Sequence, residues 1–442
     1  MRKVSERHRQ WLMKELPILE NHGVLSSEKI GDIRAYYETS TRSGMHWAVI
    51  AFSILGSLLI GSGIILLFAH NWDELTRPMR AALSFCPLAA GIILSITALL
   101  RNGGVALRES AGIFHSLAVG ASISLIGQTY HLPSNVPAFM LTWSLLVMPL
   151  IFLLRSTGVY LIYLVLICSW SGIAQETYGH AAGFWLLVLP PVVRLLQLAR
   201  KNLYSAETSL AFAGLIIGLC VSLGIALEHT VPGLWIVTYS ALLSGVALLG
   251  IHLYGDRDGW NNIPKTFGNI GIVIVTYILT WEELWNNIGW RHVHAGWNHQ
   301  SWGGWLDSGI TLICIAGWIL ALVKALRRDS IETFTVGLFP VIAGSCFLIG
   351  SLARNADLLN ALIFNGFMLY FGLMHIVLGC RSRKLSQLNG GMAVLSLLLV
   401  TRFFDSGIGY LARGTVFILL GIIFLSVNLV MVRRNKRKEV VV

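Results

Sequence analysis

The sequence predicts an all-α, polytopic transmembrane bundle of about fourteen helices with both termini in the cytoplasm. Apolar residues make up 55% of the 442-residue chain and charged residues only 12%, whereas charged residues make up about 25% of a typical soluble domain. Fourteen apolar stretches approach the roughly 20 residues that cross a bilayer. They lack the period-two alternation of barrel strands, so we predict helices, whose backbone groups bond within each segment.

Residues 1–44 are predicted to form a cytoplasmic helical hairpin. Apolar positions recur between charges over residues 5–20, and Asn-His-Gly at 21–23 is typical of a helix end, because glycine tolerates a left-handed conformation there. Ser26 or Ser27 can cap a second helix. We interpret the hairpin either as a leader that assists insertion or as a docking site for a protein partner.

The predicted transmembrane domain covers residues 45–432. Pro190–Pro191 predicts a break or kink in the sixth span, because proline removes a helix hydrogen bond. Asn365–Gly366 predicts an interruption of the twelfth. The apolar stretches lie at residues 46–69, 79–100, 110–127, 137–154, 157–174, 181–199, 208–227, 231–253, 266–281, 305–326, 331–352, 357–379, 385–401 and 413–432.

The loops between these stretches alternate in charge, and the alternation predicts the orientation. With the N-terminus inside, 27 of the 33 Lys and Arg residues face the cytoplasm, including those of a basic tail at 433–442, as the positive-inside rule requires. The first 44 residues are too polar for a cleavable signal peptide, so the first span is expected to act as an uncleaved signal. The net charge of +11 follows from these loops, and no nucleic-acid partner is predicted.

The sequence predicts neither a metal nor a cofactor. The six cysteines all fall in apolar stretches and form no CxxC pair, which argues against disulfides and Cys-based metal sites. His292, His294 and His299 could approach a zinc ion, but no HExxH motif or second spaced ligand pair accompanies them.

Few ionisable side chains lie deep in the predicted spans. His115 and His375 fall within spans, Arg194 lies near the inner end of the sixth, and no span carries Asp or Glu near its middle. Because such groups usually mark ion and proton pathways, their scarcity argues against a proton-driven pump.

The predicted outer loops concentrate residues that could recognise a ligand. Aromatic rings stack on sugar faces, and carboxylates and amides bond hydroxyl groups. The alternative is an interfacial aromatic belt with helix-capping carboxylates, and the acidic pairs at 73–74 and 282–283 could also divide acid and base work. No catalytic residue is assigned. The candidate ligand-binding residues are His70, Asn71, Trp72, Asp73, Gln128, Tyr130, His131, Glu282, Arg402 and Asp405.

Four features together resemble a known family. They are the hairpin with Trp11, His-Asn-Trp-Asp-Glu-Leu at 70–75, Gly-Gln-Thr-Tyr-His-Leu at 127–132, and Arg-Phe-Phe-Asp at 402–405. The chain is similar to an uncharacterised family of predicted bacterial multi-pass inner-membrane proteins, most strongly over about residues 5–155. This resemblance implies the bacterial cytoplasmic membrane and implies no activity.

The leading functional hypothesis is binding or transport of a polar or lipid-linked molecule at the outer, periplasmic face, with membrane lipids around the bundle. The first alternative is a membrane enzyme of lipid-linked glycan or lipid-headgroup chemistry that uses an outer-loop carboxylate. The second is a non-catalytic partner in envelope assembly or stress.

Overall fold

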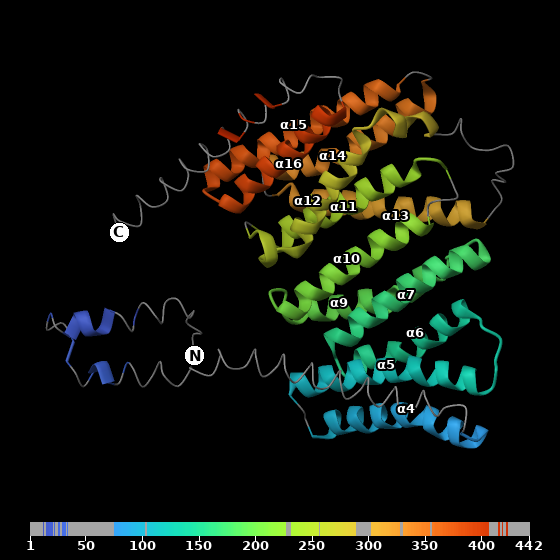
Figure 1. Ribbon diagram of the computed structural model, residues 1–442. Helices are drawn as coiled ribbons and strands as arrows, with labels where there is room; N and C mark the ends of the chain where they lie inside the picture. Colours follow the sequence, from blue (N-terminus) through green and yellow to red (C-terminus); the bar gives the residue numbers. More distant parts are fainter. Residues whose placement is uncertain are drawn as a thin grey trace. The chain divides into compact units, whose positions relative to one another are not determined.

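The structure is a computed structural model (Figure 1) that describes residues 75–405, apart from 102–103, 227–230, 256, 289–301, 328–329 and 354–355, and parts of 12–33 and 414–422. Every regular element among these residues is a helix, so the predicted all-α class is confirmed. The predicted first span at 46–69, most of the last at 413–432 and the basic tail lie outside the described residues.

Residues 1–80 form a compact unit of their own. Within it, residues 15–20 and 29–31 are helical, and the side chains of Leu16 and Ile30 are buried. The amide of Ile30 donates to the carbonyl of Ser26 at 3.1 Å, as in the first turn of a helix. The hairpin and its cytoplasmic position stay predictions.

The second unit covers residues 81–442. Its helices, the first of which begins in the preceding unit, are α4 (Arg77–Leu100), α5 (Val105–Thr129), α6 (Val136–Leu153), α7 (Thr157–Tyr178), α8 (Phe184–Leu187), α9 (Leu189–Lys201), α10 (Ala206–Ala226), α11 (Leu234–Tyr254), α12 (Ile263–Leu279), α13 (Trp302–Ala325), α14 (Ile331–Leu352), α15 (Asp357–Ser382) and α16 (Leu385–Asp405), with short 3-10 turns η2 (Gly259–Asn261) and η3 (Glu282–Asn287).

Nine of the helices within the described ranges are long and apolar enough to cross a membrane, namely α4, α5, α6, α7, α10, α11, α13, α14 and α15. The chain is therefore a multi-pass membrane protein. The predicted number of fourteen spans stays a prediction.

Side-chain caps fix where several helices begin. Four side chains accept the backbone N–H of the third residue of a helix at 3.0–3.2 Å: those of Ser156 for α7, Asn135 for α6, Asn262 for α12 and Ser330 for α14. The first amides of a helix have no partner within it, so a cap of this kind stabilises the helix start by about 1 kcal/mol. These caps set the boundaries of the polar sites described below.

The two predicted helix interruptions have different outcomes. The sixth span is broken, because α8 and α9 are separate helices that meet at Val188. The Pro190–Pro191 pair lies in the first turn of α9, where proline costs no hydrogen bond. The interruption at Asn365–Gly366 is wrong, because α15 is continuous there and the Asn365 amide donates to the Ala361 carbonyl at 2.8 Å.

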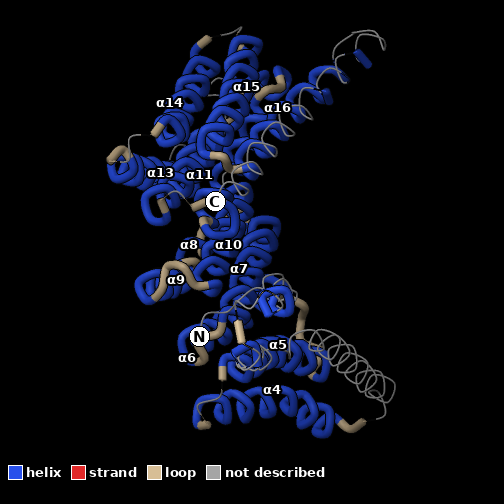
Figure 2. The backbone as a smooth tube through the Cα atoms, turned by 90° about the vertical axis from the view of Figure 1, so that its left-hand side faces the viewer, coloured by secondary structure: helices blue, strands red, loops and turns tan. Residues whose placement is uncertain are grey.

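The buried side chains of this unit gather in two main clusters. One lies among α6, α7, α8, α9 and α10, and the other among α11, α12, α13, α14 and α15. Helix α11 packs against α12, α13 and α14, and α15 packs along α16, as Figure 1 shows. Figure 2 shows the α15–α16 pair from a second side. The helices that carry the polar sites are therefore held by apolar packing on their inner faces.

Small residues let α11 and α12 approach closely. A Cβ atom on Gly268 of α12 would lie 2.7 Å from the backbone nitrogen of Ala247 on α11. A Cβ on Gly250 of α11 would likewise collide with the backbone of Lys265. Glycine at both positions therefore brings the loop between the two helices against the start of α12.

Candidate functional site

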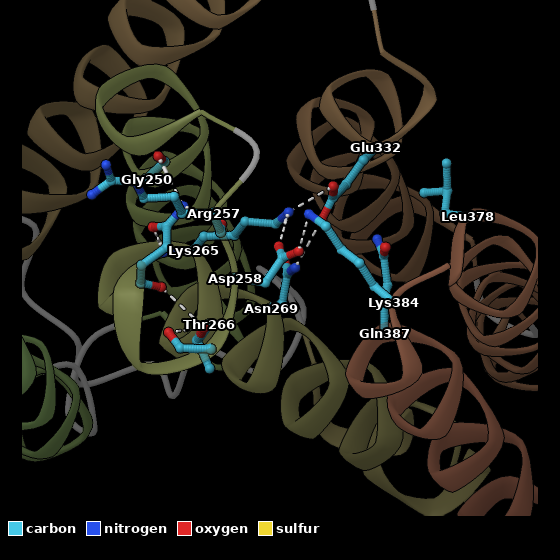
Figure 3. Close-up of polar contacts among 12 residues, drawn as sticks. Gly250, Arg257, Asp258, Lys265, Thr266, Asn269, Glu332, Leu378, Lys384 and Gln387 are labelled. Atoms are coloured by element: carbon cyan, nitrogen blue, oxygen red, sulfur yellow. Dashed lines mark hydrogen bonds and ion pairs between the residues drawn. The ribbon is translucent and has the colours of Figure 1, made fainter. Parts of the chain in front are cut away.

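Four charged side chains meet where the α11–α12 loop, α12, α14 and the α15–α16 loop come together (Figure 3). Lys265 Nζ lies 2.7 Å from Asp258 Oδ1 and 2.9 Å from Glu332 Oε2. Lys384 Nζ lies 2.5 Å from Asp258 Oδ2. The amide of Asn269 donates to Glu332 Oε1 at 3.3 Å. We call Asp258, Lys265, Glu332 and Lys384 the ion-pair network.

The local backbone positions this network. The Asn262 side chain donates to the carbonyls of Gly250 and Arg257, at 3.2 and 3.1 Å, and accepts the backbone N–H of Lys265 at 3.2 Å. It thereby ties the end of α11, the loop and the start of α12 together. Asp258 and Lys265 stand at opposite ends of this tied segment, and their side chains meet across it.

The network lines a cavity of about 340 Å³, which Ser330, Ser382 and Gln387 also line. Burial by itself raises the pKa of Asp258, but the hydrogen bonds and positive charges of Lys265 and Lys384 outweigh it and hold this pKa below its usual value. Two lysines balance two carboxylates, so the network is neutral as a whole. Its geometry suits a tie between helix ends better than a binding site for an ion.

Sequence reasoning missed this network. The charge alternation places Lys265 and Lys384 among the 27 inner Lys and Arg residues and assigns no role to Asp258 and Glu332. The available signal was the presence of acidic residues in two loops otherwise rich in Lys and Arg. No local pattern shows that Asp258 and Lys384, 126 residues apart, form a pair.

Among the predicted outer residues, Arg402 has the best-defined surroundings. Its guanidinium donates to Asn365 Oδ1 at 3.0 Å and to the carbonyl of Thr280, and it lies 5.0 Å from the ring centre of Trp281. We call Arg402, Asn365, Thr280 and Trp281 the Arg402 group. It ties α15, α16 and the end of α12 together. Glu282 follows Trp281 and is exposed.

Gln128 and His131 line a different cavity, of about 590 Å³, between the end of α5 and the start of α6. Tyr130 lies beside it and is 55% exposed. No residue of the Arg402 group lines this cavity. The structure thus brings Arg402 next to the segment of Glu282, and Gln128 next to His131.

His70, Asn71, Trp72 and Asp73 lie outside the described residues, and so does the side chain of Asp405. Their convergence with the residues above stays a prediction. Within the described ranges no three His, Cys, Asp or Glu side chains group as metal ligands would, and the loop with His292, His294 and His299 lies outside those ranges.

An apolar groove of about 410 Å³ runs between α10, α11 and α13, with Trp185 of α8 at its wall. Its walls carry side chains such as Leu223, Leu242 and Ile313, and Lys324 also lines it. The indole nitrogens of Trp185 and Trp318 are buried and have no hydrogen-bond partner among the described residues. We call this feature the α10–α11–α13 groove.

Comparison with known proteins finds one relationship. Residues 18–160 match the profile of a family described as "Predicted membrane protein (DUF2157)". No curated protein and no solved structure gives a match. The matched segment contains α4, α5 and α6 and the cavity with Gln128 and His131. The predicted resemblance to an uncharacterised membrane-protein family is therefore confirmed over 143 of the 442 residues, and the chain is an integral, multi-pass membrane protein that carries the signature of this family in its N-terminal third.

Proposed function

We propose that the protein binds or transports a lipid-linked polar molecule, whose apolar chain occupies the α10–α11–α13 groove. The observation that carries the proposal is the chemistry of this groove. Its walls are apolar and include one lysine and the side chains of Trp185 and Trp318, whose buried indole N–H groups have no partner among the described residues. A buried donor without an acceptor is destabilising by about 1–3 kcal/mol.

An amphipathic ligand would resolve this mismatch. Its hydrocarbon part fits the apolar walls, where each buried CH₂ group contributes about 0.8 kcal/mol relative to water. Its ester or glycosidic oxygens would accept hydrogen bonds from Trp185 and Trp318 once these rings turn their buried N–H groups toward the groove. A purely polar substrate would bury no hydrocarbon against the apolar walls. A purely apolar substrate would leave the indole donors without acceptors.

We also propose that the protein lies in the bacterial cytoplasmic membrane with both termini in the cytoplasm. The Lys and Arg distribution supports this orientation. The contacts between loops support the same orientation. The ion-pair network joins three predicted inner loops, and the Arg402 group joins two predicted outer span ends. In this orientation Trp185 is nearer the outer face and Lys324 nearer the inner face. We further propose that the bound molecule is handled or released at the periplasmic face.

The test fills the groove without disturbing its walls. Gly317 lines the groove, and a Cβ atom added there meets no atom within 4 Å. Gly344 on α14 is equally open but does not line the groove, so Gly344→Phe is the matched control. Phenylalanine also has a higher helix propensity than glycine, so neither change should impair folding.

The measurement is native mass spectrometry of lipids that remain bound to the detergent-purified full chain. We expect the wild type and Gly344→Phe to retain the same lipid-sized adduct and Gly317→Phe to lose it. Retention of the adduct by Gly317→Phe, or no adduct in the wild type, would reject a lipid-binding groove and favour a packed scaffold.

A further inference from the structure

A polar cavity, separate from the ion-pair network, lies at the start of α5, the ends of α6 and α9 and the start of α10. Its volume is about 420 Å³. Four basic and two acidic side chains line it, namely Arg108, Arg155, Arg194, Lys201, Glu109 and Glu207. The predicted topology places it at the cytoplasmic surface of the membrane.

Glu109 keeps its negative charge, but its carboxylate oxygens are hydrogen-bonded to the start of α7. Its carboxylate accepts hydrogen bonds from the Ser156 hydroxyl at 2.6 Å and from the amides of Thr157 and Gly158 at 2.7 and 2.8 Å. These amides open α7, so the carboxylate satisfies donors that the helix itself leaves free and faces the positive end of the helix dipole.

The basic side chains outnumber the carboxylates near them, and Glu207 and Glu109 act on Arg194 only at longer range than a close ion pair. Arg194 is only 8% exposed, and the hydrogen bond that its guanidinium makes is to the Arg155 carbonyl, at 3.3 Å. The Nε atom of Arg108 is buried without a partner among the described residues. None of the four cations forms an ion pair with a described carboxylate.

This arrangement is electrostatically incomplete. Buried charges are normally paired, because removing an ion from water without a partner is costly. Two carboxylates, Glu109 and Glu207, face four cations, so the cavity carries an excess of two positive charges. A bound anion would supply the missing negative charge and the missing acceptors.

We propose that this cavity binds a phosphate group, carried either by the headgroup of an anionic lipid or by a soluble phosphate compound. Guanidinium groups present paired donors that match the oxygens of a phosphate, and a phosphate offers several acceptors to side chains that converge from different helices. Basic pockets between helix ends on the cytoplasmic side are typical sites for anionic lipid headgroups. The apolar Val105, Leu154 and Leu198 also line the cavity and suit the glycerol and upper acyl part of a lipid.

The experiment measures thermal unfolding of the detergent-purified full chain at constant ionic strength. The added probes are short-chain phosphatidylglycerol, short-chain phosphatidylcholine and glycerol 3-phosphate. The variants are Arg108→Gln and Arg194→Gln. The matched control is Arg200→Gln, which removes an exposed arginine from the same helix as Arg194 without touching the cavity. Arg108 Nε has no partner among the described residues, so Arg108→Gln is the second cavity variant and keeps the test valid if Arg194→Gln does not fold.

We expect phosphatidylglycerol to stabilise the wild type and Arg200→Gln more than phosphatidylcholine does. Each of the two cavity variants should bind at least about tenfold more weakly, since each loses a charge-assisted hydrogen bond. Equal stabilisation by glycerol 3-phosphate, with the same dependence on Arg108 and Arg194, would assign the site to a soluble phosphate compound. No stabilisation by either phosphate probe, or equal losses in Arg200→Gln and Arg108→Gln, would overturn the proposal. The cavity shares no lining residue with the α10–α11–α13 groove, so this result is independent of the lipid-adduct test.

Discussion

Lys265 is the centre of the ion-pair network, and replacing it by methionine should destabilise the fold strongly. Its ammonium group contacts Asp258 and Glu332 at 2.7 and 2.9 Å, and its side chain is only 9% exposed. Methionine keeps the length and apolar stem of the side chain while removing the charge. The change therefore isolates the electrostatic contribution.

The magnitude follows from what remains after the substitution. Asp258 keeps Lys384, but Glu332, with 12% of its side chain exposed, keeps only the Asn269 amide at 3.3 Å. Removing one partner of a buried ion pair typically costs about 3–5 kcal/mol. Lys384 is 37% exposed, and pairs at exposed sites contribute about 1 kcal/mol or less. We therefore expect Lys265→Met to lower the free energy of unfolding by at least about 3 kcal/mol and Lys384→Met by about 1 kcal/mol.

The assay is reversible unfolding of the purified protein by titration with SDS in mixed micelles, followed by tryptophan fluorescence. A double variant, Lys265→Met with Glu332→Gln, removes the stranded carboxylate and should recover about 1–3 kcal/mol of the loss. Similar losses for Lys265→Met and Lys384→Met, or no recovery in the double variant, would refute the assignment of Lys265 as a buried, doubly paired cation.

Two further predictions concern pH and orientation. The pKa of Asp258 lies below its usual value in the folded protein, so its stabilising contribution is complete above the unfolded pKa of about 4 and is lost as the pH falls through the folded pKa. The free energy of unfolding should therefore drop more steeply below about pH 4 in the wild type than in Asp258→Asn, and parallel curves would contradict this. In a cysteine-free background, Ser134→Cys should react with an impermeant thiol reagent in intact spheroplasts and Arg327→Cys only after lysis, whereas the opposite pattern would reverse the topology.

The ion-pair network shows why local sequence patterns could not reveal the polar sites. Asp258 and Lys265 are seven residues apart, but the Lys384 that completes the Asp258 site is 126 residues away. Their meeting depends on the glycines that bring α11 and α12 together and on the packing of α15 along α16. Charge alternation assigned these residues to one side of the membrane, but it carries no information about which of them touch.

The interruptions predicted at Pro190–Pro191 and Asn365–Gly366 also separate local effects from those of tertiary packing. Pro190–Pro191 marks a real break because the missing amide hydrogens and the fixed backbone angle act locally. Asn365–Gly366 does not interrupt α15, because the asparagine amide bonds the preceding turn and the carbonyl of Thr280 on a neighbouring segment. Whether an asparagine ends a helix or joins two depends on what lies beside it.

Hydropathy and charge by themselves determined the helical class, the multi-pass membrane character and most helix positions, including the 331–352 span that matches α14. They suffice for these features because the bilayer imposes a length and an internally bonded backbone on every segment that crosses it. Only the tertiary structure decided that Arg402 contacts Thr280 and Trp281, that Glu332 is buried against Lys265, and that four basic side chains share one cavity. Electrostatic and hydrogen-bond energies fall off over a few ångströms, and distances of that order between remote residues are fixed by helix packing rather than by the order of residues in the chain.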